Sequence, residues 1–215
     1  VLFHSDIHMA RNEWNNTSIY PMVPGHEIIG IVKEVGSSVT KFKVGDNVGV
    51  GVYVDACEKC DNCNSGKDHY CEEGIVLTYN SYEYGTRNIT YGGYSKRIVV
   101  KENYVIKVPS EMDMKKAAPL LCAGITTYSP LRHFKINSNH KVGIAGLGGL
   151  GHMGLKFASS FGADVVVFST SDSKKDEAFE MGANHFVNVN NSKDVRKHMN
   201  SCDYILDTVS ANRDM

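Results

Sequence analysis

Short apolar runs separated by turn residues characterise the first half of the chain. The β-branched run Ile28–Val32 predicts a strand, and a turn signal at residues 34–38 follows it. Residues 42–50 continue this pattern of short strands and turns, whereas residues 79–91 are polar and aromatic without a period and predict a loop. Further strands are predicted at residues 92–95, 97–100 and 104–108. The first part of the chain is therefore expected to be rich in β-structure.

After Pro109 the pattern changes to an alternation of strands and helices. Apolar runs predict strands at residues 141–145, 165–168, 185–187 and 204–207. Helices are predicted from the Asp113 cap to Ala118, at 122–134, from Met153 to Phe161, at 174–181 and at 195–199. Strands that alternate with helices indicate a parallel α/β sheet. The sequence thus predicts two domains, residues 1–110 and residues 111–215.

The composition and charge exclude several classes of protein. The chain has 215 residues, of which 42% are hydrophobic, so it can bury a core and is not expected to be disordered. A formal net charge of −1 provides no basic field for a nucleic-acid backbone. Without a run of about 18 apolar residues, no membrane span is predicted. Because Val1 lies inside an apolar run and Met215 closely follows a predicted strand, both domains are expected to be truncated.

Four of the six cysteines lie close together in the sequence. Cys57, Cys60, Cys63 and Cys71 form a C-x2-C-x2-C-x7-C pattern. Four thiolates from one loop suit a structural Zn²⁺ ion with tetrahedral coordination and no vacant position for substrate. Disulfides are one alternative, but two-residue spacings suit bridges poorly and the chain is larger than typical disulfide scaffolds. An iron–sulfur cluster is another, although ferredoxin runs continue with x3-C-P, whereas seven residues intervene here.

A glycine-rich loop follows the predicted strand at residues 141–145. The residues of this loop match G-x-G-x-x-G and come directly before a predicted helix: Gly146, Leu147, Gly148, Gly149, Leu150 and Gly151. In dinucleotide-binding proteins the first glycine permits a tight turn, the second lets the backbone approach the pyrophosphate, and the third lets the helix pack on the strand. We therefore predict dinucleotide binding, with an ordinary strand-to-helix turn as the alternative.

The end of the next strand indicates which dinucleotide is bound. An acidic residue that binds the ribose 2′-hydroxyl normally lies about 20 residues after the glycine loop. Here the strand ends in hydroxyl residues followed by two lysines: Ser169, Thr170, Ser171, Lys174 and Lys175. The one acid nearby, Asp172, falls inside the loop. Because hydroxyl and ammonium groups bind a 2′-phosphate that a carboxylate would repel, this pattern predicts NADP(H) rather than NAD(H). Alternatively, the hydroxyl residues only cap the following helix.

Several ordered motifs resemble a known family. They are His4–His8, Tyr20–Glu27, the four-cysteine run, Pro119–Thr126, Gly146–Gly151 and Asp207–Ser210. On these motifs the sequence resembles the zinc-dependent medium-chain dehydrogenases, in particular the cinnamyl-alcohol-dehydrogenase-like branch. The resemblance implies an α/β fold in which a GroES-like β-rich catalytic domain precedes a Rossmann dinucleotide-binding domain. It also implies a catalytic Zn²⁺ in the cleft between the domains, and the interconversion of primary alcohols and aldehydes with NADP(H).

The resemblance further implies roles for individual residues. His26 and Cys122 would bind the catalytic zinc, and Glu27 would bind it in some states. The zinc would lower the pKa of the alcohol, and a hydride would pass to the nicotinamide. Ser5 would pass the alcohol proton towards His8 and solvent. Asp6 would support this site, and Trp14 would line the substrate pocket or simply be a packed aromatic. The expected cofactor-binding residues are Thr126, Gly146, Gly148, Gly149, Leu150, Gly151, Ser169, Thr170, Ser171, Lys175 and Thr208.

One position departs from the family pattern. The family places a cysteine, as the third catalytic zinc ligand, where this sequence has Phe3. Phenylalanine cannot donate electrons to zinc. Three interpretations remain: Phe3 is an artefact of the chain end, zinc binds through His26, Glu27 and Cys122 with weaker affinity, or the catalytic metal is lost. In the last case the protein is a degenerate member that binds a nucleotide as a sensor or structural protein.

The remaining expectations concern partners and location. A zinc-ribbon-like interaction module is a third hypothesis, which the near-zero net charge and the glycine loop disfavour. The expected partner is a small alcohol or aldehyde, aromatic or medium aliphatic, with no nucleic acid and no membrane. The resemblance also allows a homodimer of the longer protein. Thiol-rich composition favours the cytoplasm, and NADP(H) favours aldehyde reduction. The 215-residue chain alone is not expected to catalyse, because part of the nicotinamide-side sheet would follow Met215.

Overall fold

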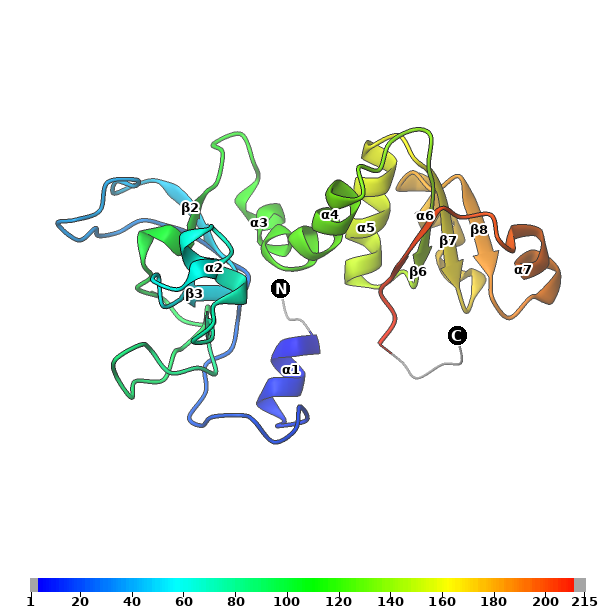
Figure 1. Cartoon of the computed structure of the whole chain (residues 1–215). Helices are drawn as coiled ribbons and strands as arrows, with labels where there is room; N and C mark the ends of the chain where they lie inside the picture. The colour runs from blue at the N-terminus through cyan, green and yellow to red at the C-terminus, as the bar shows by residue number, and fades with distance from the viewer. Residues whose placement is uncertain (1–3, 211–215) are drawn as a thin grey trace. The chain divides into compact units, whose positions relative to one another are not determined.

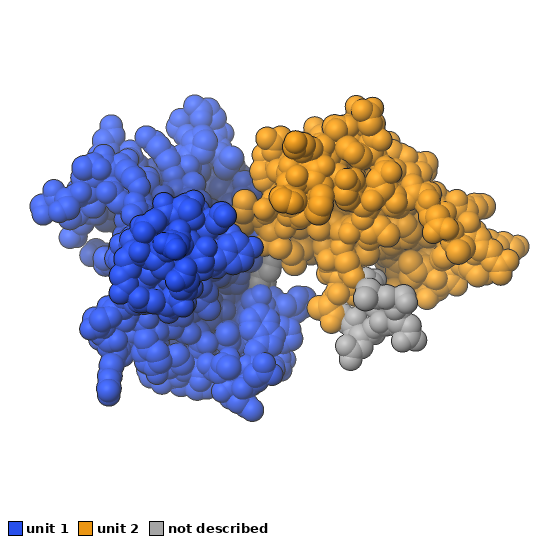
Figure 2. Space-filling model, viewed as in Figure 1, with its two compact units in different colours: residues 1–122 blue, residues 123–215 orange. Residues whose placement is uncertain are grey.

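The chain divides into two compact units, Val1–Cys122 and Ala123–Met215 (Figure 2). The computed structural model describes residues 4–210. Residues 111–122 cluster with the first unit, because Leu121 packs against β2: a Cβ on Gly49 would lie 3.0 Å from its Cδ1. The domain boundary between residues 110 and 111 stays a prediction.

The first unit is built from short strands and short helices (Figure 1). Its helices are α1 (His4–Ala10), α2 (Asp61–Asn64) and α3 (Met114–Ala117), with 3₁₀ turns η1 (Asp68–Tyr70), η2 (Glu102–Tyr104) and η3 (Ala118–Leu121). Its strands are β1 (Ile28–Ile31), β2 (Asn47–Val50), β3 (Tyr53–Asp55), β4 (Val76–Leu77) and β5 (Val105–Lys107). An antiparallel sheet has the order β1-β2-β5, and β3 pairs with β4. The expected β-rich first part is therefore present.

Two predictions for this unit are wrong in detail. Residues 97–100 form no strand, although they are β-branched in composition, because no neighbouring strand among the described residues supplies backbone hydrogen bonds and Val99 is 99% exposed. Residues 92–95 form no strand either, and the N–H groups of residues 92–94 donate to the carbonyls of residues 23–25. The helix α1 and the strand β4 are not predicted by the apolar pattern.

The second unit is a parallel α/β sheet, as the alternating pattern predicts. Its strands are β6 (Lys141–Ala145), β7 (Asp164–Ser169), β8 (His185–Asn188) and β9 (Tyr204–Asp207), in the order β8-β7-β6-β9. Its helices are α4 (Ala123–His133), α5 (Gly149–Ser160), α6 (Lys175–Glu180) and α7 (Ser192–His198), with a 3₁₀ turn η4 (Asp172–Lys174). All three strand pairs are parallel, so the carboxyl ends of the strands meet at one edge.

Side-chain caps explain where the helices α3 and α7 begin. Asp113 caps α3 as predicted, because its side chain accepts a hydrogen bond from the backbone N–H of Lys115 at 2.9 Å. The helix α7 begins at Ser192, three residues before the predicted start at Val195, because the side chain of Asn191 caps it. Both examples show that a side-chain acceptor at the N-cap, rather than the first apolar residue, determines the helix start.

The core of the second unit lies between the sheet and its helices. The side chains of Val142 and Ile144 on β6, Val165 and Val167 on β7 and Leu155 on α5 are fully buried. The helix α5 contacts β6 and β7, α4 packs on α5, and α6 and α7 contact β8. Among residues 4–210 no helix combines the length and apolar character needed to cross a bilayer.

We expect Leu155→Ala to destabilise the second unit. The leucine side chain is fully buried, so truncation removes apolar contacts and leaves a cavity that costs about 2–5 kcal/mol. Urea denaturation followed by circular dichroism measures this loss. The matched control Leu155→Met conserves volume and should cost less than about 1.5 kcal/mol. Equal stability of the two variants would contradict the assigned core.

Candidate functional site

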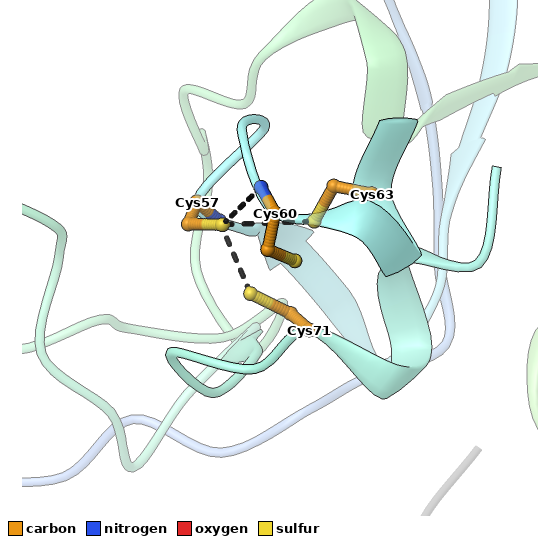
Figure 3. Close-up of side chains that lie close together, drawn as sticks. All are labelled: Cys57, Cys60, Cys63 and Cys71. Carbon is orange, nitrogen blue, oxygen red and sulfur yellow. Dashed lines mark hydrogen bonds between the residues drawn. The ribbon is translucent and has the colours of Figure 1, made fainter. Parts of the chain in front are cut away.

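The four predicted zinc-binding cysteines converge in the first unit (Figure 3). Their Sγ atoms all lie within 4.8 Å of one another, and the Cys57 and Cys63 sulfurs are 3.8 Å apart. A tetrahedral zinc with bonds of about 2.3 Å to sulfur separates its ligand atoms by about 3.8 Å. The thiols are not joined as disulfides. Four sulfurs this close together enclose one ion, so the residues fit a single zinc rather than a cluster of several irons.

Hydrogen bonds stabilise the thiolate form of Cys71, whereas the pKa values of Cys57 and Cys63 are raised by burial and by the neighbouring thiols. The N–H of Cys57 donates to Sγ of Cys71, and the N–H of Cys60 donates to Sγ of Cys57, both at 3.4 Å. The Tyr84 hydroxyl lies 3.6 Å from Sγ of Cys71 and within hydrogen-bond distance of the carbonyl of Gly74, so its single proton can be donated to either of the two. Burial opposes ionisation of Cys71, but these hydrogen bonds outweigh it and lower its pKa to about 6. A low thiol pKa favours metal binding, since the thiolate is the ligand.

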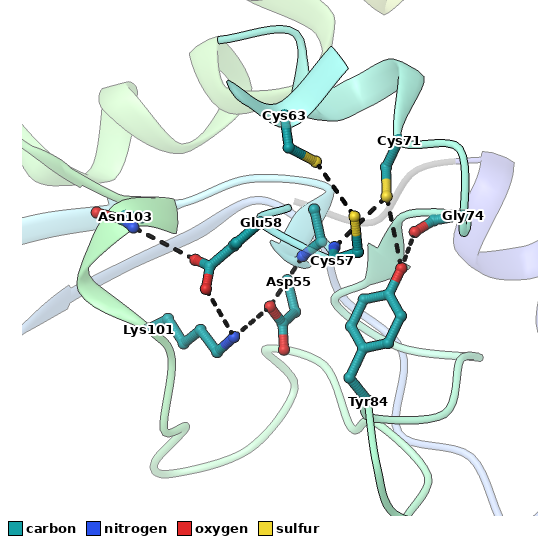
Figure 4. A network of polar contacts seen from close by, with 10 residues as sticks. Asp55, Cys57, Glu58, Cys63, Cys71, Gly74, Tyr84, Lys101 and Asn103 are labelled. Atoms are coloured by element: carbon teal, nitrogen blue, oxygen red, sulfur yellow. Dashed lines mark hydrogen bonds and ion pairs between the residues drawn. The ribbon is translucent and has the colours of Figure 1, made fainter. Parts of the chain in front are cut away.

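An ion-pair network fixes the first turn of the cysteine run (Figure 4). Lys101 Nζ lies 2.6 Å from Oδ1 of Asp55 and 3.3 Å from Oε2 of Glu58. Asn103 donates to Oε1 of Glu58 at 3.3 Å. Glu58 has a φ of 57°, a conformation that costs energy for a residue with a Cβ. Its two side-chain partners hold the backbone in the turn that joins Cys57 to Cys60.

The predicted ligand His26 is held by a buried carboxylate. Its Nδ1 lies 3.0 Å from Oδ1 of Asp6, and the two side chains are 6% and 2% exposed. The Asp6 carboxylate also accepts from the N–H of Gly25 at 3.1 Å and from the Tyr94 hydroxyl at 3.0 Å. In many zinc sites an imidazole that donates from Nδ1 to a carboxylate binds the metal through Nε2. The supporting role expected of Asp6 thus has a structural basis, whereas the contribution of Tyr94 was not anticipated.

Close backbone contacts position this site. The N–H groups of Gly93 and Tyr94 donate to the carbonyls of Gly25 and Pro24 at 2.9 and 3.0 Å. A Cβ on Gly93 would overlap with the side chain of Ile28 on β1. The two segments can therefore approach only because position 93 carries no side chain, and their approach brings the Tyr94 hydroxyl to Asp6.

Cys122 comes next to His26 although the two are far apart in sequence. Burial alone would lower the pKa of His26, but hydrogen bonds and charges from Asp6 and Cys122 raise it to about 10. The neighbouring Glu27 has its Oε2 atom buried. Two of the three predicted zinc ligands, His26 and Cys122, therefore interact directly. A zinc ion would displace the proton that His26 holds. Position 3, where the sequence departs from the family pattern, lies outside the described residues.

The residues of the expected proton relay lie on or near α1. Ser5 and His8 are three positions apart and so share one side of this helix. The Nδ1 atom of His8 lies 2.5 Å from Oε2 of Glu13, and its ring stacks on Trp14 with centroids 5.6 Å apart. Trp14 is 44% exposed. His8 is thus oriented by an acid that the sequence did not single out.

In the second unit the glycine loop has the geometry that the motif predicts. Gly146 has a φ of 84°, which disfavours any residue with a Cβ. A Cβ on Gly151 would overlap with the carbonyl oxygen of Gly146, so only glycine lets α5 begin this close to β6. In contrast, a Cβ on Gly148 would meet no atom within 4 Å. The space beside Gly148 fits an approaching pyrophosphate, and Gly149 and Leu150 form the first residues of α5.

Three side chains hold three successive carbonyls of this loop. The Thr208 hydroxyl lies 2.8 Å from Ala145 O and 3.1 Å from Gly146 O. Lys174 Nζ donates to Leu147 O at 2.7 Å, and His152 Nδ1 lies 2.6 Å from Gly148 O. Because the carbonyls are occupied, the loop is fixed independently of a ligand. His152 also contacts Glu177 Oε1 at 3.0 Å through Nε2. The histidine follows the motif directly, but sequence reasoning assigned it no role.

The other predicted cofactor residues also lie in this unit. Ser169 ends β7, and Thr170, Ser171 and Lys175 follow it as exposed residues at the carboxyl edge of the sheet. Thr126 is exposed on α4. The structure therefore brings the hydroxyl residues to the same edge as the glycine loop, as the parallel strands require. Lys174 differs from the expectation in one respect, because its ammonium group binds the loop carbonyl.

Two family models match the chain. The alcohol dehydrogenase GroES-like domain matches residues 2–110, and the zinc-binding dehydrogenase model matches residues 149–215. The two models confirm the predicted fold class, in which a GroES-like domain precedes a Rossmann-type domain.

Relatives and solved structures agree with these matches. The NADP-dependent alcohol dehydrogenase C 1 of Mycolicibacterium smegmatis is 52% identical over 99% of this chain and 60% of its own length. A cinnamyl alcohol dehydrogenase structure from Sorghum bicolor has a TM-score of 0.94 at 43% identity, covering 99% of this chain and 60% of that one. The Helicobacter pylori enzyme complexed with NADP(H) has a TM-score of 0.89 at 46% identity, covering 99% and 59%. The chain thus spans about 60% of the length of these proteins.

Two glycine variants should separate folding from cofactor binding. Gly148→Ala adds a methyl group in open space, so the free energy of unfolding should stay within about 1 kcal/mol. The same methyl group would obstruct the pyrophosphate, and NADPH affinity measured by calorimetry should fall about tenfold or more. Gly151→Ala should lower both, with about 1–3 kcal/mol lost from stability. Normal NADPH binding by Gly148→Ala would contradict the assigned pyrophosphate position.

We also expect Cys60→Ser to remove the metal of the four-cysteine lobe. A hydroxyl is a poor zinc ligand, so zinc content by elemental analysis should fall by about one ion per chain. The matched control Cys202→Ser changes a half-buried cysteine outside the lobe and should keep the metal. Loss of zinc from both variants, or from neither, would be inconsistent with the assignment.

Proposed function

We propose that this chain acts as part of an oxidoreductase that interconverts primary alcohols and aldehydes, because it belongs to the zinc-dependent medium-chain alcohol dehydrogenases with a GroES-like domain. Among these it resembles the cinnamyl-alcohol-dehydrogenase-like members. The observation that carries the proposal is the buried Asp6–His26 pair with Cys122 beside it. A GroES-like catalytic domain at residues 1–110 and an NADP-binding domain at residues 111–215 form part of the proposal.

Two zinc sites with different tasks support this function. Cys57, Cys60, Cys63 and Cys71 would hold a structural zinc, and His26, Cys122 and Glu27 would hold the catalytic one. When bound, the catalytic zinc acts as a Lewis acid towards the alcohol oxygen, and the nicotinamide of NADP(H) accepts or supplies the hydride. Asp6 fixes the orientation of the His26 ring and raises its basicity, which strengthens it as a ligand.

Residues of α1 move the proton. Ser5 accepts the hydroxyl proton of the substrate and passes it towards His8, which lies on the same side of the helix. Glu13 contacts Nδ1 of His8 and so orients the ring. The ring is also partly exposed, so the proton leaves from it to the solvent. Trp14 stacks on this ring and forms part of the wall around an aromatic or medium aliphatic substrate.

The second unit binds NADP(H) in this proposal. The glycine loop and the start of α5 bind the pyrophosphate, and Thr208 keeps the loop in position. Ser169, Thr170, Ser171 and Lys175 bind the 2′-phosphate, and Thr126 lies near the nicotinamide. Because cells usually keep the NADP pool reduced, the physiological direction is aldehyde reduction. The expected location is the cytoplasm.

Phe3 favours a second candidate function. The family has a zinc-ligand cysteine at this position, and a site with only His26, Glu27 and Cys122 binds metal more weakly or not at all. The protein would then be a catalytically degenerate member that binds NADP(H) without performing chemistry.

The variant Phe3→Cys distinguishes the two functions. We expect it to raise the zinc content from about one to about two ions per chain, because it completes a three-ligand catalytic site. Elemental analysis of protein purified without added metal gives the count, and the double variant Phe3→Cys/His26→Ala should return to about one. About two ions in the unchanged chain would support a working site that needs no cysteine at position 3.

The proposed activity can be tested in a chain of the relatives' length. Residues 1–215 can be joined to the remaining segments of the Mycolicibacterium smegmatis relative, with and without Phe3→Cys. NADPH-dependent reduction of an aromatic aldehyde by the chimera that carries Phe3→Cys supports the alcohol dehydrogenase. Absence of activity from that chimera, when it binds NADPH and two zinc ions, would overturn the proposal.

A further inference from the structure

The glycine loop and Asn188 lie on opposite sides of the strand β7, at the edge where the adenosine half of the cofactor is expected to bind. In the sheet order β8-β7-β6-β9, β6 lies on one side of β7 and β8 on the other. The glycine loop continues from β6, where Ala145 is paired with Phe168 of β7. On the opposite side, Ser169 at the end of β7 is paired with Asn188 at the end of β8. A group attached to Asn188 is therefore held on the side of β7 away from the glycine loop.

Asn188 holds the carboxylate of Asp172 on that far side. Its Nδ2 donates to Oδ2 of Asp172 at 3.1 Å. Its Oδ1 accepts a hydrogen bond from the backbone N–H of Asn190 at 3.0 Å, so the amide is oriented with the donor towards Asp172. Asn190 in turn donates to the carbonyl of Thr170 at 2.8 Å. The turn after β8 thus fixes both the backbone and the acid of the loop that follows β7.

The cation of the same loop is held on the other side. Lys174 Nζ donates to Leu147 O of the glycine loop at 2.7 Å. The loop after β7 therefore places the Lys174 ammonium beside the expected phosphate groups. The Asp172 carboxylate of the same loop is held on the side of β8. This separation matters because Asp172 is the acid nearest in sequence to the position where NAD-binding proteins carry their ribose-binding carboxylate.

We propose that Asn188 is a specificity-determining residue for the cofactor, which excludes the Asp172 carboxylate from the 2′-position of the adenosine ribose. The inference rests on the proposed NADP(H) function and extends it to a residue on a different strand from the phosphate-binding hydroxyls. Asn188 itself need not touch the cofactor; it acts by holding Asp172. A released carboxylate repels a 2′-phosphate and accepts a hydrogen bond from a 2′-hydroxyl, so both effects favour NAD(H).

The experiment is a double-mutant cycle on the full 215-residue chain. The variants are Asn188→Ala, Asp172→Asn and the combination of the two. Calorimetry measures the affinities for NADPH and NADH, and for adenosine 2′,5′-bisphosphate and 5′-AMP, which differ only in the 2′-phosphate. The matched control is Asn191→Ala, because Asn191 donates to Asp194 at 3.0 Å in the same way but at the start of α7. Thermal unfolding of each variant monitors the fold.

We expect Asn188→Ala to lower the NADPH-to-NADH affinity ratio by about tenfold, which corresponds to one uncompensated like charge near the phosphate. The same fall should appear between adenosine 2′,5′-bisphosphate and 5′-AMP. Adding Asp172→Asn should restore the ratio, because the repelling charge is then gone. Asp172→Asn alone and Asn191→Ala should leave the ratio unchanged.

Two results would overturn the inference. The first is an unchanged ratio in folded Asn188→Ala, and the second is a lowered ratio that Asp172→Asn fails to restore, which would indicate a structural effect on the loop. If Asn188→Ala does not fold, Asn188→Asp takes its place, since its Oδ1 keeps the bond from Asn190 while its charge repels Asp172. Failure of the unchanged chain to bind NADPH would instead refute the proposed function on which the inference depends.

Discussion

The hydrogen bonds of the buried Asp6 carboxylate are the interactions on which the candidate metal site of the first unit depends. The carboxylate joins α1, the segment before β1 and the segment around Tyr94, which are far apart in sequence, through three hydrogen bonds. A buried carboxylate requires such partners, because an unsatisfied charge in this position would be strongly destabilising. The same contacts orient His26, so the structure of the unit and the geometry of its candidate ligand have one common cause.

In the second unit, close packing at a glycine organises the candidate site, as the contacts of a buried carboxylate do in the first unit. The lack of a side chain at Gly151 lets α5 begin against the carbonyl of Gly146, and Thr208, Lys174 and His152 then hold the loop carbonyls. Both candidate sites are thus organised by the protein itself, which reduces the entropy lost when a metal or dinucleotide binds.

Much of the fold and of the site could be predicted locally. The strands β6 to β9 and the helix α5 follow from apolar periodicity, and the four-cysteine spacing indicates a metal site because ligands close in sequence are close in space. The predicted strand at residues 97–100 failed because a strand needs a partner, which periodicity does not reveal. The role of Tyr94 was missed for a similar reason: 88 residues separate it from Asp6.

By itself the sequence determined the order of strands and helices in the second unit, the glycine loop, the cysteine lobe and the likeness to a dehydrogenase family. Each of these depends on residue types at short spacings. Only the tertiary structure decided that Asp6 holds His26, that Cys122 lies beside it, and that Asn188 rather than a nearer residue binds Asp172. Those contacts join different strands, loops and helices, so they depend on how the elements pack, and no local pattern of side chains encodes them.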